Sequence, residues 1–294
     1  MTLKIKVDKL DLFTKVLNAA AAVLEDEGTF LITPADGMTL RNMDKSRFAM
    51  VDLKIQPNYF TDEFICDKEY LVTIQMQDLK KILQRARKDD TLTLELDESK
   101  DTLNFLFEGL VKRRFILPLT MAEENVLPDP TSLKLDAHAK LRGGALTEFI
   151  KDAAIIGGSI KIAAETDKLT FSSSQDKREV RIEINSGTDE SEAFDIEAEG
   201  TCEALYSIDT FKNLILVDQA FSSVQLAFST DHPLKLVYEN AEGIILGYLL
   251  APMQPETEME EEDDSGEVYD DEDWDEDEDW EKDEEEEDWD EDEE

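Results

Sequence analysis

Apolar and polar residues alternate along much of the chain, and this period-two pattern predicts β-strands with one buried face. Polar residues such as Thr93, Glu95 and Arg181 separate the apolar ones. Helical periodicity occurs in only four segments, so we expect an α+β chain with few helices. The clearest predicted strands have their apolar residues at Leu92, Leu94 and Leu96; at Leu103, Phe105 and Phe107; at Val180, Ile182 and Ile184; and at Val224, Leu226 and Phe228.

The four predicted helices cover residues 9–24, 76–88, about 146–156 and about 209–217. The second, MQDLKKILQRARK, places Leu79, Ile82, Leu83 and Ala86 on one helical face. Its other face is basic, although the chain as a whole is acidic. A solvated basic face needs no function, so this helix alone decides nothing. The basic residues are Lys80, Lys81, Arg85, Arg87 and Lys88.

The order of predicted elements repeats once along the chain. MQDLKKIL at residues 76–83 aligns with IDTFKNLI at 208–215, an offset of about 132 residues. The segments 92–94 and 224–226, 114–118 and 247–251, and 12–15 and 146–151 align at similar offsets. We therefore expect two similar domains.

Charge and proline content set the limits of these domains. Residues 256–294 contain 29 of the 72 acidic residues and one base, Lys282, so this tail alone carries a charge of −28. The preceding 255 residues have a net charge of −14. The tail has too little apolar surface to offset its ordering entropy, and we expect it to be disordered. Residues 118–133 contain three prolines and show neither the period-two pattern of a strand nor the periodicity of a helix. This composition predicts an extended connector.

Several classes of function find no support in the sequence. No stretch approaches the roughly 20 apolar residues that span a bilayer, and the first ten residues lack the apolar region of a signal peptide. Cys66, Cys202, His138 and His232 form neither a disulfide framework nor a metal-ligand spacing. There is no glycine-rich phosphate loop and no nucleophile motif. We expect an intracellular protein that is not an enzyme and needs no cofactor or metal.

Four stretches carry a resemblance to a known family: DGMTLRNMDKSRFAMVDL (36–53), MQDLKKILQRARKDDTLTL (76–94), VKRRFILPL (111–119) and GYLLAP (247–252). With the repeat and the connector, residues 1–255 resemble the DNA polymerase sliding clamps, in particular archaeal proliferating cell nuclear antigen. The tail has no counterpart there. The resemblance implies an α+β clamp fold, with two helices packed on antiparallel sheets in each domain. The domains would be residues 1–117 and 134–255, joined by the connector 118–133 and followed by the tail 256–294.

The resemblance further implies a homotrimeric ring that encircles duplex DNA without reading its sequence. Helices would line the hole, and their basic residues would meet phosphates. The second domain is poorer in basic residues, so we expect the lining to be uneven. The DNA-facing residues would be Lys15, Lys80, Lys81, Arg87, Lys88, Lys151 and Lys212.

Two further surfaces follow from the same resemblance. Arg85 and Arg113 would form an ion-pair seam with Glu148 and Asp152 of the neighbouring subunit, an assignment that we favour slightly over direct DNA contact. An apolar groove beneath the connector would bind peptides of the type Gln-x-x-aliphatic-x-x-aromatic-aromatic. Its residues would be Met43, Arg47, Phe48, Met50, Val126, Leu127, Pro233, Leu249, Ala251 and Pro252.

The partners implied are duplex DNA, DNA polymerase, a clamp loader, a nuclease and a ligase, with no membrane. The location would be the cytoplasm with the nucleoid in an archaeon, or the nucleus in a eukaryote. Two alternatives stay open: an acidic chaperone-like protein that binds basic partners through its tail, and a subunit of a heteromeric clamp. The tail could steer basic clients or serve only solubility.

Overall fold

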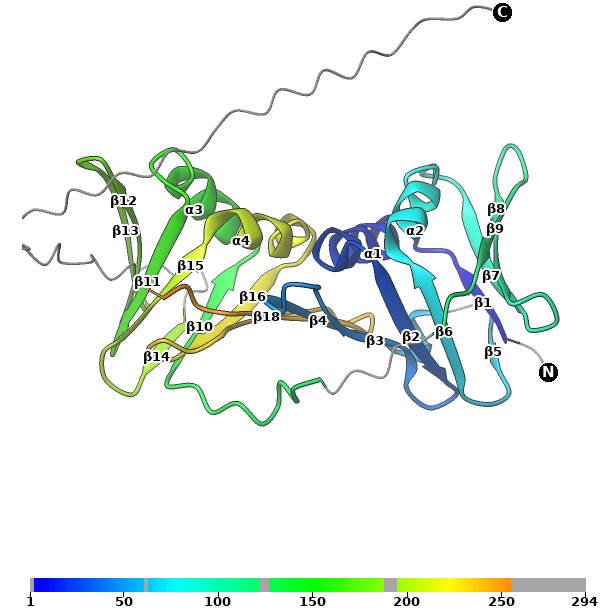
Figure 1. Ribbon diagram of the computed structural model, residues 1–294, viewed down its shortest axis with the longest axis horizontal. Coiled ribbons are helices and arrows are strands. Elements are labelled where there is room, and N and C mark those ends of the chain that lie inside the picture. Colours follow the sequence, from blue (N-terminus) through cyan, green and yellow to red (C-terminus); the bar gives the residue numbers. More distant parts are fainter. Residues whose placement is uncertain (1–2, 61–62, 122–126, 188–194, 255–294) are drawn as a thin grey trace, which may run out of the picture. The chain divides into compact units, whose positions relative to one another are not determined.

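The computed structural model describes residues 3–60, 63–121, 127–187 and 195–254 (Figure 1). Residues 1–255 form one compact unit, and residues 256–294 are a separate unit outside the described residues. The expectation of a disordered tail therefore falls outside the described part of the chain. No helix in that part is long and apolar enough to cross a membrane.

The described parts of the two halves contain the same α-helices and strands in the same order: one strand, one helix, five strands, a second helix and three strands. This order confirms the repeat and the α+β class. The first half contains β1 (Leu3–Val7), α1 (Leu10–Leu24), β2 (Glu27–Thr33), β3 (Gly37–Met43), β4 (Ala49–Ile55), β5 (Phe64–Cys66), β6 (Tyr70–Gln75), α2 (Met76–Leu83), β7 (Thr91–Asp97), β8 (Thr102–Glu108) and β9 (Arg113–Pro118). The second half contains β10 (Ala137–Arg142), α3 (Ala145–Ala153), β11 (Ser159–Glu165), β12 (Lys168–Gln175), β13 (Arg178–Asn185), β14 (Asp195–Ala198), β15 (Cys202–Ser207), α4 (Ile208–Leu214), β16 (Ser223–Phe228), β17 (Leu234–Glu239) and β18 (Ile244–Leu250).

All strand pairs are antiparallel, and the sheets follow the repeat. The five-stranded sheet β5-β1-β7-β8-β9 corresponds to β14-β10-β16-β17-β18 in the second half. The four-stranded sheet β13-β12-β11-β15 corresponds to β4-β3-β2-β6 in the first half. The halves are joined because β18 pairs with β4, which makes one nine-stranded sheet. The two predicted domains therefore share a sheet.

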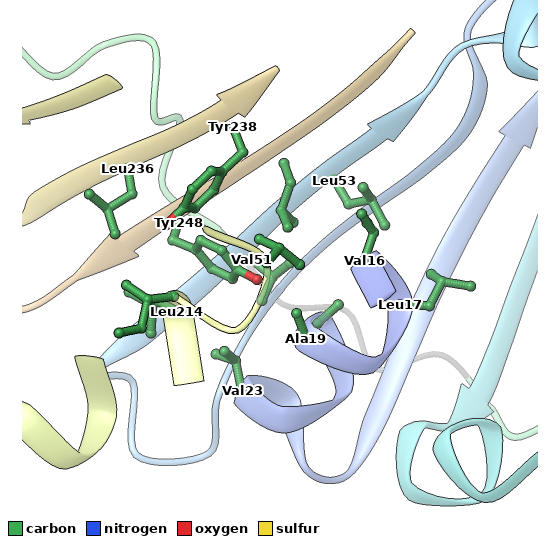
Figure 2. Close-up of a cluster of buried hydrophobic side chains, with 14 of the residues drawn as sticks. Val16, Leu17, Ala19, Val23, Val51, Leu53, Leu214, Leu236, Tyr238 and Tyr248 are labelled. Carbon is green, nitrogen blue, oxygen red and sulfur yellow. The ribbon is translucent and has the colours of Figure 1, made fainter. Parts of the chain in front are cut away.

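The junction between the halves has a dense apolar core. Helices α1 and α4 pack against each other beneath β4 and β18, as Figure 2 shows. Val51 of β4 and Tyr248 of β18 are directly opposite partners and are both fully buried. Val23 of α1 and Leu214 of α4 complete the cluster. Burying each large apolar side chain contributes roughly 1.5–3 kcal/mol, so this core holds the halves together.

The predicted helices exist, but three of them end early. The first is confirmed as α1. The second was predicted to reach Lys88 and ends at Leu83; the last two end at Ala153 and Leu214 rather than near residues 156 and 217. After Leu83 the backbone N–H groups of Arg85 and Ala86 bond to carbonyls three residues earlier, which tightens the chain into a turn. The apolar period continued through Ala86, so it did not mark this end.

A buried carboxylate fixes the start of α3. Asp218, which is fully buried, accepts hydrogen bonds from the Thr147 backbone N–H at 2.9 Å and the Thr147 hydroxyl at 3.1 Å. The preceding Gly144 has φ 90°, a left-handed conformation that glycine adopts without strain. Burial raises the pKa of Asp218, whereas these hydrogen bonds oppose the rise. Asp218 therefore caps α3 from a distant part of the chain.

We expect Asp218→Ala to destabilise the second half. The substitution leaves the Thr147 N–H without its acceptor and opens a cavity, at a cost of about 1–3 kcal/mol in unfolding free energy. Asp218→Asn keeps an acceptor oxygen and should lose less. Urea unfolding followed by circular dichroism measures both variants. Equal unfolding midpoints for Asp218→Ala and the unmodified protein would contradict this role.

Candidate DNA-facing helices and partner groove

The predicted DNA-facing lysines lie on all four helices, on the sides away from the core. Lys15 is on α1, Lys81 on α2 and Lys212 on α4, and all three are exposed. Lys151 on α3 is also exposed, and Lys80 on α2 is half-buried. All five lysines therefore lie on helices, and Lys80 is less exposed than the other four.

Three of these lysines are paired with a carboxylate on the same helix. Lys15 Nζ lies 2.7 Å from the carboxylate of Asp11, four residues earlier. Lys81 pairs with Asp78 at 2.8 Å, and Lys212 with Asp209 at 3.0 Å. Such i,i+3 and i,i+4 pairs are weak in water, but they reduce the net charge of the helices. Glu148 and Asp152 on α3 were named from the sequence as seam residues, whereas these three acids were overlooked.

The other predicted DNA contacts, Arg87 and Lys88, lie on the turn after α2 rather than on the helix. Both side chains are exposed. The nearly buried Asp90 accepts a hydrogen bond from the Arg87 backbone N–H at 2.9 Å and thereby directs the chain away from the helix axis. This contact stabilises the turn that follows the shortened helix.

The proposed seam residues already have contacts within their own chain. Arg113 pairs with Asp90 and donates a hydrogen bond to the Arg85 carbonyl oxygen. Glu148 accepts a hydrogen bond from Arg142 at 3.0 Å, while Arg85 and Asp152 are exposed. Arg113 therefore organises the turn after α2, and a substitution there would disturb its own subunit. The seam itself stays a prediction, because it needs a second subunit.

Several predicted groove residues form one row across the nine-stranded sheet. Met43 of β3 is opposite Met50 of β4, which is opposite Leu249 of β18. Met50 is 1% exposed and Leu249 is 7% exposed, so neither offers much free surface. Ala251, Pro252 and Pro233 are half-buried near the ends of β18 and β17. Val126 lies outside the described residues.

The exposed part of the groove is formed by the loop before β4. Phe48 is 60% exposed, and its carbonyl accepts a hydrogen bond from Ala251 N–H at 2.7 Å. Arg47 has φ 58° and is exposed beside it. A pocket of about 460 Å³ is lined by Met43, Arg47 and Leu127, three of the residues named for the groove. Its remaining lining is largely polar, in contrast to the apolar groove that we expected: Leu24, Asp26, Glu27, Thr29, Asn42, Asp44, Lys45 and Gln75.

The connector is anchored over the sheet by residues that the sequence analysis missed. Asp129 accepts hydrogen bonds from the backbone N–H and the hydroxyl of Thr131, which lower the pKa of its carboxyl group. Lys235 on β17 donates to the Pro130 carbonyl at 3.1 Å. The Asp-x-Thr spacing is a turn signal that could have been read from the sequence. The Lys235 contact joins residues 105 positions apart and has no local signal.

The described residues contain no group of three or more His, Cys, Asp or Glu side chains that could hold a metal ion. Cys66 and Cys202 are free thiols, and burial raises the pKa of each. Neither is therefore activated as a thiolate at neutral pH.

Residues 2–124 match the family model of the proliferating cell nuclear antigen N-terminal domain. The chain is 32% identical over 241 residues to the DNA polymerase sliding clamp of Thermofilum pendens, covering 81% of this chain and 94% of the relative. It is 33% identical over 232 residues to the sliding clamp of Nanoarchaeum equitans, covering 79% and 92%.

Two solved structures are similar along nearly their whole length. Proliferating cell nuclear antigen from Thermococcus kodakaraensis has a TM-score of 0.77 at 27% identity, covering 86% of this chain and all of that one. A chain of the PCNA2–PCNA3 complex from Sulfolobus tokodaii has a TM-score of 0.76 at 28% identity, covering 85% and 99%. The fold is the DNA clamp fold, and the chain belongs to the DNA polymerase sliding clamp family. Its function is that of a sliding clamp in DNA replication.

Proposed function

We propose that three copies of this chain join head to tail into a ring that encircles duplex DNA, and that the ring tethers DNA-processing enzymes without catalysing a reaction. The observation that carries this proposal is the internal repeat of the sheets. One junction is made inside the chain, and the strands for the equivalent junction are left at two sheet edges. Light scattering tests the assembly, and we expect a mass about three times the chain mass of 33.4 kDa.

The two edges are β9, at the end of the five-stranded sheet, and β13, at the end of the four-stranded sheet. By the repeat, β9 is equivalent to β18 and β13 is equivalent to β4. Since β18 and β4 pair antiparallel within the chain, β9 of one copy has the right partner in β13 of the next. Figure 1 draws β9 and β13 on opposite sides of the compact unit. Such a heterologous contact closes into a ring when the rotation per subunit divides a full turn.

The strand registers predict which residues meet across this contact. Phe105 of β8 and Leu236 of β17 occupy equivalent positions in the two halves. Phe105 pairs with Phe115 of β9, and Leu236 pairs with Tyr248 of β18. Phe115 is therefore equivalent to Tyr248. Val180 of β13 is equivalent to Val51 of β4 in the same way. Tyr248 and Val51 are opposite partners within the chain. We therefore expect Phe115 to lie opposite Val180 of the neighbour, where both half-buried side chains would become buried.

Ion pairs at the helix ends would flank this strand contact. Arg85 is exposed near β9, and Glu148 and Asp152 are exposed on α3, which packs against β13. We propose that Arg85 faces these acids across the seam. Exposed ion pairs contribute only about 0–1 kcal/mol each, so we assign most of the interface stability to the strands and their apolar face.

The proposed DNA contact uses the side of the four helices that faces away from the sheets. Phosphates would meet Lys15, Lys80, Lys81, Lys151 and Lys212 on the helices, and Arg87 and Lys88 on the turn after α2. Contacts of this kind carry no sequence information, which suits a ring that must slide over any sequence. We accordingly expect the protein to be found with chromosomal DNA.

We propose the pocket beneath Leu127 as the docking site for short peptides of DNA polymerase, a clamp loader, a nuclease and a ligase. Arg47 lines this pocket and Phe48 follows it, and both side chains are exposed. Their loop is fixed because the Asp44 carboxylate accepts a hydrogen bond from the Ala49 N–H at 2.8 Å and the Asp44 carbonyl accepts one from the Arg47 N–H at 3.0 Å. A fixed loop binds a peptide at a smaller entropic cost than a mobile one. The polar lining favours clients with polar groups beside their apolar anchors.

A heteromeric ring is the second candidate assembly. The PCNA2–PCNA3 complex of Sulfolobus tokodaii contains two different clamp chains, and this chain is similar to a chain of that complex. The light-scattering measurement separates the alternatives, because a subunit of an obligate heteromer would not form a trimer by itself.

We propose that the acidic tail steers basic clients to the docking site. The last described residues are held beside β15, where the Met253 N–H bonds to the Leu205 carbonyl at 2.7 Å. The tail follows directly and carries a charge of −28. Its field acts over a screening length of about 8 Å at physiological salt.

Truncation after Pro255 should therefore slow the association of a docking peptide with flanking Lys or Arg residues. We expect a several-fold loss in on-rate at low salt, because steering acts on encounter. A peptide with neutral flanks is the matched control and should bind at an unchanged rate. Stopped-flow fluorescence measures both. Equal on-rates of the basic peptide for the full and truncated proteins would exclude steering and leave solubility as the role of the tail.

A further inference from the structure

The four helices proposed to face DNA have no net charge. They carry five lysines against five acids, which contrasts with the basic lining that the sequence analysis expected. The lysines are Lys15, Lys80, Lys81, Lys151 and Lys212, and the acids are Asp11, Asp78, Glu148, Asp152 and Asp209.

The balance is local on three of the helices. Asp11, Asp78 and Asp209 each lie in the first turn of a helix and hold the lysine one turn later at 2.7, 2.8 and 3.0 Å. The exposed fractions of the six paired side chains range from 49% to 86%, so these pairs lie on the side away from the core. Glu148 on α3 instead pairs with Arg142, and no ion pair of Lys151 is found among the described residues.

The excess positive charge lies outside the helices. Arg85, Arg87 and Lys88 follow one another on the exposed turn after α2, with Asp89 as the adjacent acid. A phosphate that approaches this turn meets a net positive charge. A phosphate that approaches α1 or α4 meets a lysine whose charge is already compensated.

We propose that Asp11, Asp78 and Asp209 limit the affinity of the ring for DNA. This inference rests on the proposed function, since it takes these helices to face the duplex. Each carboxylate competes with phosphate for its lysine and repels the phosphate when the lysine turns away. The helices then form a nearly neutral surface past which the duplex slides, and the basic turn after α2 provides the main attraction.

The exposure of these ion pairs determines how strongly they compete with DNA. An exposed ion pair in water is weak, so a phosphate can displace the carboxylate from its lysine. The displaced carboxylate stays within about one screening length of the DNA and opposes the contact. Fewer counterions are then released for each lysine than a free lysine would release, so both the affinity and its salt dependence are reduced.

A first-turn aspartate also stabilises its helix through the helix dipole, which gives these residues an ordinary structural role. Asparagine keeps the size of aspartate and one acceptor oxygen, and it replaces the other carboxylate oxygen with a neutral NH2 group. Asp→Asn substitutions therefore separate an effect on DNA contact from a loss of folding. Circular dichroism and light scattering on each variant check fold and assembly.

The test compares two triple variants of the full chain with the same change in net charge. The helix variant is Asp11→Asn with Asp78→Asn and Asp209→Asn. The matched control removes three exposed acids that are paired with lysines and lie outside the helices: Asp36→Asn, Glu98→Gln and Glu203→Gln, whose partners are Lys54, Lys68 and Lys161.

Binding to a fluorescent linear duplex is measured by anisotropy between 50 and 200 mM salt. We expect the helix variant to bind at least about tenfold more tightly at 50 mM salt and to show a steeper salt dependence, because more phosphates are neutralised. The control variant should stay within about twofold of the unmodified protein, since its sites lie away from the DNA. Adding Lys15→Ala and Lys212→Ala to the helix variant should remove much of the gain.

Equal affinities and salt slopes for the two triple variants would overturn this inference. The singly substituted Asp78→Asn and Asp209→Asn proteins decide the question if the triple variant does not assemble, and each should bind more tightly than Glu203→Gln. Retention on circular DNA measures encirclement independently of the affinity for linear duplex. If the protein is released when the circle is linearised but the two triple variants have equal affinities for linear duplex, the affinity-limiting role is rejected and the proposed function is supported.

Discussion

We expect Val180→Asp to convert the proposed ring into monomers. By the repeat, Val180 takes the place that Val51 has at the internal junction, where Val51 is fully buried opposite Tyr248. A carboxylate at such a site has no partner, and its desolvation costs several kcal/mol at each contact of the ring. In the free chain Val180 is only half-buried, so a charged side chain there can still reach water. Light scattering should report the single-chain mass of 33.4 kDa.

Leu71→Asp is the matched control for this substitution. Leu71 is 58% exposed on β6, a strand that takes no part in the proposed contact between β9 and β13, and its replacement introduces the same charge on an exposed strand. We expect this variant to stay trimeric. Circular dichroism establishes that both variants are folded. A trimer formed by folded Val180→Asp protein would show that β13 does not make the contact.

A charge exchange tests the register itself. By the repeat, Ile116 of β9 is equivalent to Leu249 of β18, and Glu179 of β13 is equivalent to Met50 of β4. Leu249 and Met50 are opposite partners within the chain. Ile116 should therefore lie opposite Glu179 of the neighbouring subunit. Ile116→Glu should weaken the ring by placing like charges opposite each other, and adding Glu179→Lys should restore it. Ile116 is 58% exposed, so its substitution affects the free chain little. Failure of the second change to restore assembly would contradict this register.

The sequence predicted the repeat and most of the fold because both depend on local periodicity. The strands around Leu94, Phe105 and Leu226 alternate clearly and were found where expected. The junction between β4 and β18 could not be read in this way. It pairs Val51 with Tyr248, nearly two hundred residues apart, and nothing local distinguishes these strands from the sheet edges β9 and β13.

Side-chain partners at the candidate site were predicted less well than backbone elements. The helix predicted for residues 76–88 extends past the end of α2 at Leu83. The helical periodicity could not show that the Asp90 carboxylate accepts a hydrogen bond from the Arg87 N–H in the following turn. Arg113 was assigned to a neighbour, although Asp90 also holds Arg113 within its own chain. A partner choice of this kind is decided by which strands and turns meet in space. The aspartates one turn before Lys15 and Lys212 had a readable helical spacing, and they were overlooked because the lysines were considered without their neighbours.

Encirclement should govern how the protein is held on DNA. The helices proposed to face the duplex have no net charge, so affinity alone cannot retain it at physiological salt. A protein that simply binds about 6–10 phosphates loses roughly 10³–10⁵ in affinity between 50 and 200 mM salt. A closed ring on circular DNA has no free end from which to leave, and its retention should change little over this range.

Replacing Lys15, Lys81 and Lys151 together by alanine should weaken loading and sliding and leave the trimer intact. The three residues are exposed and contribute nothing to the core, so the fold should be unaffected. Retention of the loaded ring at 200 mM salt should change by less than about twofold, since topology rather than charge holds it. A loss of retention comparable to that caused by linearisation would show that charge holds the protein on DNA.

Encirclement is tested most directly by measuring how well the protein is retained on a circular DNA molecule before and after the circle is cut. The protein is loaded on a nicked circle at low salt and passed through a gel-filtration column at 200 mM salt, with and without prior cleavage by a restriction enzyme. We expect the protein to elute with the intact circle and to be lost from the linear DNA. Equal retention on both forms would contradict encirclement.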